Sequence, residues 1–199
     1  MSDFIRTFIA MDLNEILVHT IKQVQAHLKS LNCDIKWVKP ENIHLTLKFL
    51  SDVPLQRIDR VKEVLGNIAQ LTPPLRLELT SLGAFPSPER ARVIWVGLKD
   101  DQKRFETLAD SLETQLGNMG FKKEARAFSP HITIGRARSP KNLDALSREM
   151  KKYSLPASLV QEALDIVLYK STLTSAGPVY EELARFPFSL QAPNSPGAC

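Results

Sequence analysis

Two histidines of this chain are each followed, two positions later, by a threonine. The first motif is His44-Leu45-Thr46-Leu47 and the second is His131-Ile132-Thr133-Ile134. An imidazole has an unperturbed pKa near 6.5, so it can donate or accept a proton at neutral pH. A threonine hydroxyl can donate a hydrogen bond to an oxygen that gains negative charge during a reaction. Two such pairs facing one cleft would supply the groups needed for proton transfer at phosphorus.

An extended strand is the element that would orient each motif. Side chains alternate between the two faces of a strand, so His and Thr share one face while the apolar residues between them are buried on the other. The same pattern also fits two ordinary half-buried strands whose polar faces happen to carry His and Thr. In that case both histidines would matter mainly for stability, and the motifs alone leave the two interpretations open.

Composition narrows the class of protein. The chain has 199 residues, 43% hydrophobic and 24% charged, which suits one sizeable globular domain or two small lobes. No apolar run approaches the roughly 18 residues that span a membrane, and the N-terminus lacks the pattern of a signal peptide. Cys33 and Cys199 are the only cysteines, so we expect no structural disulfide and a cytoplasmic location. Neither motif carries a carboxylate or thiol at ligand spacing, so we expect no metal.

The positive charge is concentrated around the second motif. The whole chain has a formal net charge of +4 and a pI near 9.1. Residues 121–141 alone reach +5, because they hold one acid and six basic residues, namely Lys122, Lys123, Arg126, Arg136, Arg138 and Lys141. A basic rim attracts anions such as RNA phosphates, although a basic run is also common on a solvated face.

Hydrophobic periodicity predicts strands and helices that alternate along the chain. Strands are expected over residues 3–11, 35–38, 43–50, 75–80, 91–98, 164–171 and 179–188, and over the second motif. Helices are expected over about 14–31 and 105–119, and in two segments opened by Ser51-Asp52 before Pro54 and by Ser139-Pro140. A Pro-rich loop is expected over 83–89.

This order of elements favours an α+β fold. Hairpin pairs between helices indicate antiparallel or mixed sheets and argue against a doubly wound parallel sheet. The two histidines lie nearly half the chain apart, which suggests one motif in each of two lobes.

Several segments carry a resemblance to a known family. They are residues 6–10, 37–50, 83–86, 128–136, 168–171 and 177–180, so the resemblance covers nearly the whole chain. These segments resemble the 2H phosphoesterases, and among them the RNA 2′,3′-cyclic phosphodiesterases, a group also known as 2′-5′ RNA ligases. The resemblance implies one bilobal α+β domain over residues 1–190, with duplicated sheets facing a central cleft and helices outside. Residues 191–199 would then be a disordered tail.

The resemblance also implies a reaction. It is the metal-independent hydrolysis, without a cofactor, of RNA 2′,3′-cyclic phosphate ends to 2′-phosphates, with tRNA halves as one candidate substrate. His44 would donate a proton to the leaving 3′ oxygen and His131 would accept one from water, although the residue types alone do not decide this order. Thr46, Thr133 and Arg136 would bind the phosphate. A monomer is expected, because two lobes close their own cleft.

Three of the candidate residues need a local explanation. Arg136 lies at odd spacing from the second motif, so a regular strand would point it away, as a surface arginine; a bulge at Gly135 would turn it back. Phe49 and Trp37 could stack on a base. Aromatic residues beside a strand more often belong to the core, and that is the expectation for both.

Two other functions fit the same sequence. One is the joining of RNA halves through a 2′-5′ bond, in which an RNA hydroxyl replaces water and the same residues serve. The other is a non-catalytic RNA-binding module that uses the basic residues of segment 121–141. Ligation would be recognised by a product with a 2′-5′ bond. A binding module would be recognised by an RNA affinity that does not depend on either histidine.

Overall fold

The computed structural model describes residues 3–156 and 159–190 as an α+β protein; the expected tail at 191–199 lies outside this part. The described strands are β1 (Phe4–Asp12), β2 (Ile35–Trp37), β3 (His44–Pro54), β4 (Leu75–Phe85), β5 (Val93–Leu98), β6 (His131–Ala137), β7 (Val160–Ala163), β8 (Asp165–Thr174) and β9 (Gly177–Pro187). The described helices are α1 (Glu15–Lys29), α2 (Ile58–Gln70), α3 (Arg104–Asn118) and α4 (Leu143–Lys152). Short 3-10 turns cover Pro40–Asn42, Leu55–Arg57 and Pro88–Arg90.

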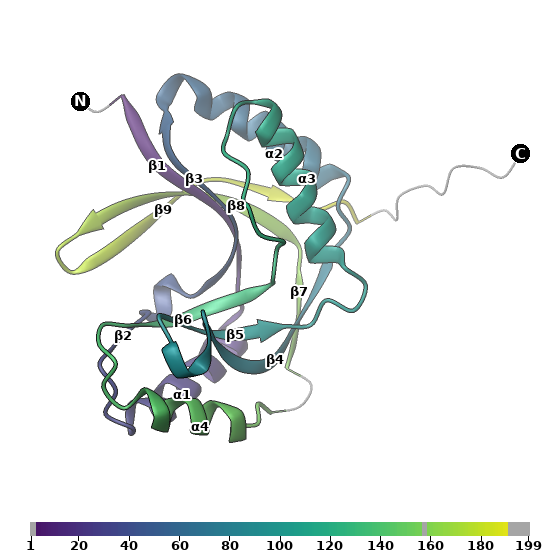
Figure 1. The fold of residues 1–199 in the computed structure, drawn as a ribbon. Coiled ribbons are helices and arrows are strands. Elements are labelled where there is room, and N and C mark those ends of the chain that lie inside the picture. The colour runs from purple at the N-terminus through teal and green to yellow at the C-terminus, as the bar shows by residue number, and fades with distance from the viewer. Residues whose placement is uncertain (1–2, 157–158, 191–199) are drawn as a thin grey trace, which may run out of the picture.

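The strands form one curled antiparallel sheet (Figure 1). Its order is β7-β4-β5-β6-β3-β1-β8-β9, and β2 pairs with β6 outside this path. The sheet has two arms that meet between the motif strands, because β3 and β6 share a single paired position, Leu45 opposite Ile132. Each arm therefore carries one His-x-Thr motif, and the two motifs lie where the arms meet.

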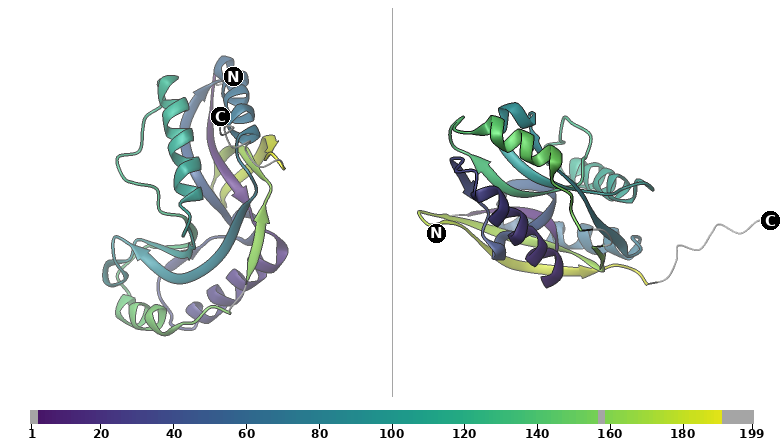
Figure 2. Two further views of the ribbon diagram at one scale, coloured as in Figure 1. Left: turned by 90° about the vertical axis from the view of Figure 1, so that its right-hand side faces the viewer. Right: turned by 90° about the horizontal axis from the view of Figure 1, so that it is seen from below.

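Two helices cover each arm. Helices α2 and α3 contact each other, and α2 packs on β8 and β9. Helix α4 packs on β4, and α1 is joined to α4 by a 2.7 Å contact between His27 and Glu149. Figures 1 and 2 show the two helix pairs at opposite ends of the molecule, with hairpin β8–β9 projecting between them. In the described part of the chain, no helix has the length and apolar character needed to span a membrane.

Helix α1 shows how local sequence places an element that later supports the site. The side chain of Asn14 accepts a hydrogen bond from the backbone N–H of Leu17 at 2.9 Å, which caps the first turn. One face of the helix is buried at helical spacing, by Leu17, Ile21, Val24 and Leu28. From the same face Gln25 donates to the carbonyls of Val38 and Ile134, at 2.8 and 2.9 Å. It thereby ties the end of β2 to the motif strand β6.

Some segments differ from the sequence prediction. Strand β3 continues to Pro54, where a helix start was predicted, because β1 pairs with it as far as Phe4 opposite Pro54. Strand β4 runs to Phe85, into the predicted loop, because it pairs with β5. Strand β7 was not predicted and pairs with the edge of β4, and α4 begins at Leu143, later than expected. Pairing partners distant in sequence decide each strand end, so local patterns could not show them.

Candidate active site

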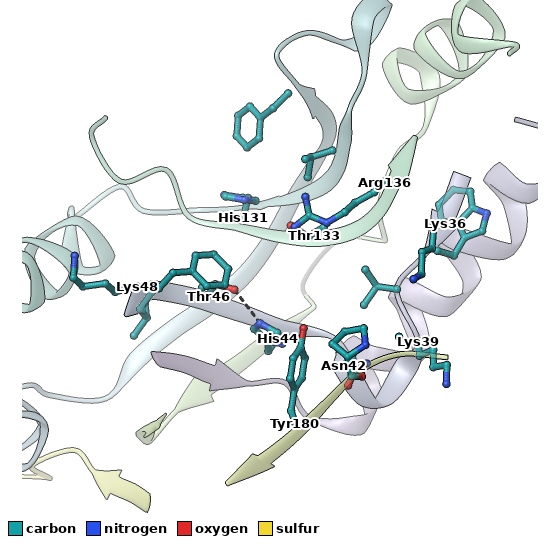
Figure 3. Close-up of a pocket in the computed structure, with 18 of the residues that line it drawn as sticks. Lys36, Lys39, Asn42, His44, Thr46, Lys48, His131, Thr133, Arg136 and Tyr180 are labelled. Atoms are coloured by element: carbon teal, nitrogen blue, oxygen red, sulfur yellow. Dashed lines mark hydrogen bonds between the residues drawn. The ribbon is translucent and has the colours of Figure 1, made fainter. Parts of the chain in front are cut away.

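One pocket of about 490 Å³ contains both motifs (Figure 3). His44 and Thr46 enter it from β3, and His131 and Thr133 enter it from β6. Arg136 also lines this pocket, so the structure brings together all five site residues that the sequence predicted.

The antiparallel register relates the two motifs to each other. Because Leu45 lies opposite Ile132, one step along the register in either direction places His44 opposite Thr133 and Thr46 opposite His131. The two histidines are then diagonal neighbours across the single paired position of these strands, and both line one pocket. A single tetrahedral phosphate between the strands can therefore face both imidazoles.

His44 lies in a largely apolar environment. The ring of Phe8 stacks on its imidazole with a centroid distance of 4.9 Å, and its Nε2 lies 2.9 Å from Thr46 Oγ1. Burial lowers the pKa of His44 to about 4, while a hydrogen bond to the backbone of Asn42 and the charge of Asp12 act in the opposite direction. In the free protein at pH 7 the His44 imidazole is therefore neutral.

His131 is held in one tautomer. Its Nδ1 lies 2.7 Å from the backbone carbonyl oxygen of Ser129. A carbonyl can only accept, so Nδ1 carries the proton and the Nε2 of the neutral ring is left as an acceptor. The rings of Phe85 and His131 meet edge-on, with a centroid distance of 5.0 Å and an interplanar angle of 86°. This contact orients the imidazole further. The Nε2 of His131 is therefore able to accept a proton.

Both motif strands carry a bulge directly after the threonine. In β6, Ile134 has no partner on β5, and in β3, Leu47 has no partner on β1. Each bulge adds one residue to the alternation, so the residue five positions after the histidine returns to the pocket face. That residue is Arg136 in β6 and Phe49 in β3. The predicted bulge beside Gly135 is confirmed, and its counterpart in β3 was not predicted.

The bulge in β3 corrects one prediction. Phe49 was expected in the core, but its side chain is 53% exposed and lines the pocket. Trp37 was also expected in the core; it is half-buried, packs against the core with one part and lines the pocket with another.

The positive residues of the pocket come mainly from the first half of the chain. Of the six basic residues in segment 121–141, only Arg136 lines the pocket. The other cations that line it are Lys36, Lys39 and Lys48. Lys48 is buried and donates to Glu113 at 2.6 Å, whereas Lys36 and Lys39 are exposed. The basic rim of the pocket is therefore different from the one that charge counting along the sequence suggested.

Tyr180 also lines the pocket, although no sequence motif predicted it as a site residue. Its ring meets His44 edge-on at 5.4 Å, and Figure 3 shows its hydroxyl pointing into the pocket. Burial raises the pKa of Tyr180, and the neighbouring Arg136 and Arg6 lower it less, so its hydroxyl is a hydrogen-bond donor at neutral pH. Its one sequence signal is its place just after the turn between the last two predicted strands, in a segment that carries the family resemblance.

Acidic and thiol groups are sparse around the motifs. Among the described residues, no three His, Cys, Asp or Glu side chains gather closely enough to hold a metal ion. The pocket is lined by imidazoles, hydroxyls and cations and by the carboxylate of Glu124, and the first three kinds of group suit proton transfer and anion binding.

The curled sheet, its flanking helices and the pocket with two His-x-Thr motifs are shared with a known class of proteins. The family model of LigT-like phosphoesterases matches the chain twice in tandem, over residues 14–95 and 96–180, with one motif in each match. The chain belongs to this family of phosphoesterases. Each match contains one motif strand and the bulge that follows its threonine.

Named relatives extend the comparison. The RNA 2′,3′-cyclic phosphodiesterase of Methanothermobacter thermautotrophicus is 35% identical over 185 residues, which cover 92% of this chain and 98% of the relative. The protein of the same name from Methanocaldococcus jannaschii is 37% identical over 176 residues, covering 88% and 96%. The structure of E. coli LigT complexed with NADP⁺ is similar with a TM-score of 0.77 and 26% identity, over 94% of this chain and 99% of that one.

Proposed function

We propose that this protein hydrolyses RNA 2′,3′-cyclic phosphate ends to 2′-phosphates. The observation that carries the proposal is the convergence of two His-x-Thr motifs on one pocket, from strands that meet at Leu45 and Ile132. The names of the relatives supply the substrate class. The ligand of the similar LigT structure, NADP⁺, carries a phosphate on a ribose 2′ oxygen, as the proposed product does.

The two imidazoles would divide the proton transfers. His131 takes a proton from water through its free Nε2, and the water oxygen forms a bond to phosphorus. The bond from phosphorus to the 3′ oxygen breaks, and His44 gives this oxygen a proton. The ring opens to a 2′-phosphomonoester and a 3′ hydroxyl, and a proton exchange with solvent resets both histidines.

The remaining pocket residues would bind the phosphate. Thr46 and Thr133 donate hydrogen bonds to its non-bridging oxygens, whose negative charge grows as phosphorus becomes five-coordinate. Thr46 contacts His44 in the free protein, at 2.9 Å, so it changes partner when substrate binds. Arg136 pairs with the same charge. Both proton transfers are assigned to side chains, so the proposal needs no metal and no cofactor.

His44 has a low pKa, so it can act as a general acid only if substrate binding raises this pKa and the imidazole becomes protonated. In the free protein, burial lowers this pKa to about 4. A phosphate anion beside the imidazole favours the protonated form, because opposite charges attract strongly where solvent is excluded. His44 would therefore take up its proton together with the substrate.

The proposal is tested by product analysis in EDTA. The substrate is an oligoribonucleotide with a 2′,3′-cyclic phosphate end, and the proteins are wild type, His44→Ala and His131→Ala. We expect a 2′-phosphate product from wild type and a loss of about 10²–10⁴-fold in each variant. His19→Ala is the matched control, because His19 is an exposed histidine of α1 outside the pocket. Undiminished turnover in either folded site variant would refute the two-histidine mechanism.

The same assay separates the alternatives. When a 5′-hydroxyl RNA is added, a 2′-5′ linked product would indicate ligation, the reverse type of transfer through the same groups. Absence of any turnover by wild type, with RNA affinity unchanged by both histidine substitutions, would instead indicate a binding module. We further propose a monomer that acts on ends such as those of tRNA halves; sedimentation and assays on such halves test these two points.

A further inference from the structure

The two ends of the pocket carry different kinds of side chain, cationic at one end and aromatic at the other. Along β3 and the turn before it, the pocket-lining side chains run in the order Lys39, His44, Thr46, Phe49. The antiparallel strand β6 and its approach run the other way, so Arg136 lies at the Lys39 end and Phe128 at the Phe49 end. The repeated bulge thus delivers a guanidinium to one end and an aromatic ring to the other, with the His-Thr groups between them.

The cationic end is assembled by strand pairing. Lys36 of β2 lies directly opposite Arg136 of β6, and residues opposite each other in an antiparallel pair have Cα atoms about 5 Å apart. Lys39 follows where β2 leads into the 3-10 turn. Figure 3 shows Lys36, Lys39 and Arg136 on one side of the two histidines.

These cations are available to a ligand. In the part of the chain that the structure describes, Lys36 and Arg136 take part in no ion pair, and Lys39 has only a 4.0 Å contact with the exposed Glu41. Among the described residues that line the pocket, Glu124 is the one acidic side chain, and it belongs to the segment before β6, toward the opposite end. The cationic end therefore holds an excess of positive charge that no described residue neutralises.

The far wall of this end is fixed in place. The side chain of Asn42 donates to the backbone carbonyl of Pro178 at 3.0 Å, which joins the turn before β3 to the tip of hairpin β8–β9. Ala176, Gly177 and Pro178 of this tip line the pocket. The ammonium of Lys36 lies beside this tip, because a Cβ atom at Gly177 would be 4.0 Å from Lys36 Nζ.

We propose that Lys36 and Lys39 bind the phosphate on the 5′ side of the terminal nucleotide. The inference rests on the proposed function, because the cyclic phosphate must occupy the His-Thr groups for the next phosphate to reach the lysines. The ribose then spans from Thr133 toward Arg136, and the base lies toward Phe49. The preferred substrate is an RNA end whose last nucleotide carries a 5′ phosphate, and a nucleoside 2′,3′-cyclic phosphate with a free 5′ hydroxyl is a poor one.

The experiment compares two small substrates that differ only at this position. They are cytidine 2′,3′-cyclic phosphate with a 5′ hydroxyl and the same compound with a 5′ phosphate; the cyclic-ended dinucleotide is a third. The measured quantity is the ratio of kcat/KM with and without the 5′ phosphate. The proteins are wild type, Lys36→Gln/Lys39→Gln, and the control Lys29→Gln/Lys152→Gln, which removes two exposed lysines of α1 and α4.

We expect the 5′ phosphate to raise kcat/KM on the order of tenfold in wild type and in the control, as charge-assisted contacts do. In Lys36→Gln/Lys39→Gln the ratio should fall close to one. A wild-type ratio near one, or an equal ratio in all three proteins, would overturn this inference while leaving the proposed function in place. If wild type hydrolysed none of the three small substrates and did not hydrolyse the cyclic-ended oligoribonucleotide either, both this inference and the proposed function would be overturned.

Discussion

At the scale of single residues, the two histidines occupy unlike environments. Both imidazoles hydrogen-bond to the backbone two residues before them, at Asn42 and Ser129. Phe8 stacks on His44, however, and burial lowers the pKa of His44 to about 4. Equivalent positions of a duplicated motif can thus take different parts in catalysis, because the neighbouring side chains differ. The low pKa of His44 therefore affects the stability of the protein as well as its activity.

We expect the wild-type protein to lose stability between pH 7 and pH 5 through His44. Its pKa is about 4 in the folded protein and near 6.5 in the unfolded chain. Between these values the unfolded chain binds the proton and the folded protein does not, so the free energy of unfolding falls as the pH falls. The stabilisation is complete above pH 6.5, and roughly 1–2 kcal/mol of it is lost by pH 5.

Urea denaturation of wild type and His44→Gln at both pH values measures this difference. The variant lacks the titrating group, so its free energy of unfolding should fall less between pH 7 and pH 5. Equal losses in the two proteins would mean that His44 is not held neutral by burial.

At the scale of elements, the bulges decide what the strands present to the pocket. In β6 the residue after the bulge needs to lack a side chain, because β2 lies against it. A Cβ atom at Gly135 would lie 2.7 Å from Ile35 Cγ2 and 3.1 Å from Trp37 Cε3. Gly135 therefore allows β2 to approach, and this approach is what sets Lys36 beside Arg136.

We expect Gly135→Ala to impair substrate binding more than it impairs chemistry. Strand β2 must move to accommodate the methyl group, which displaces Lys36 and Arg136, so KM should rise several-fold with a smaller change in kcat. Overpacking of this kind also costs roughly 1–3 kcal/mol of stability. Steady-state kinetics and urea denaturation measure the two effects.

Gly66→Ala is the matched control for this change. Gly66 lies in α2, where a Cβ atom would meet no described neighbour closer than 3.7 Å. Alanine favours a helix over glycine by up to about 1 kcal/mol, so this variant should be as stable as wild type or more so, with unchanged kinetics. A Gly135→Ala protein with wild-type KM would contradict the part that we give to the bulge.

At the scale of the whole molecule, an ion pair with a buried lysine joins parts that are far apart in the chain. Lys48 of β3, with its side chain 1% exposed, donates to Glu113 of α3 at 2.6 Å and to the carbonyl of Lys122 at 3.0 Å. Glu113 also accepts from the backbone N–H of Glu124 at 3.1 Å. The pair fastens the segment that leads to His131 onto the strand that carries His44.

We expect Glu113→Ala to destabilise the protein by roughly 3 kcal/mol, because it leaves a buried ammonium group without its counter-charge. Replacing both partners, as in Lys48→Met/Glu113→Leu, should cost much less, since no unpaired charge remains. Urea denaturation of the full chain measures both. Glu63→Ala is the control: Glu63 pairs with Arg60 at 2.6 Å on the exposed surface, where such a pair contributes about 1 kcal/mol or less. A Glu113→Ala cost as small as the control's would contradict this account.

Much of the fold followed from local pattern. Alternation placed His44 with Thr46 and His131 with Thr133 on one face, and both pairs do line the pocket. The helix predicted over about 14–31 is confirmed as α1 (Glu15–Lys29). These features depend on neighbours a few residues apart, so a single sequence contains the information for them.

The sequence by itself determined the two motifs, the α+β class and the family resemblance, because each depends on residue types at short, regular spacing. Only the tertiary structure decided that Phe49 faces the pocket, that Lys36 lies beside Arg136, and that Tyr180 joins the site. Each of these depends on the register between strands distant in sequence. A one-residue bulge reverses the face of every later side chain, and what creates the bulge is the pairing with a partner strand that local pattern does not reveal.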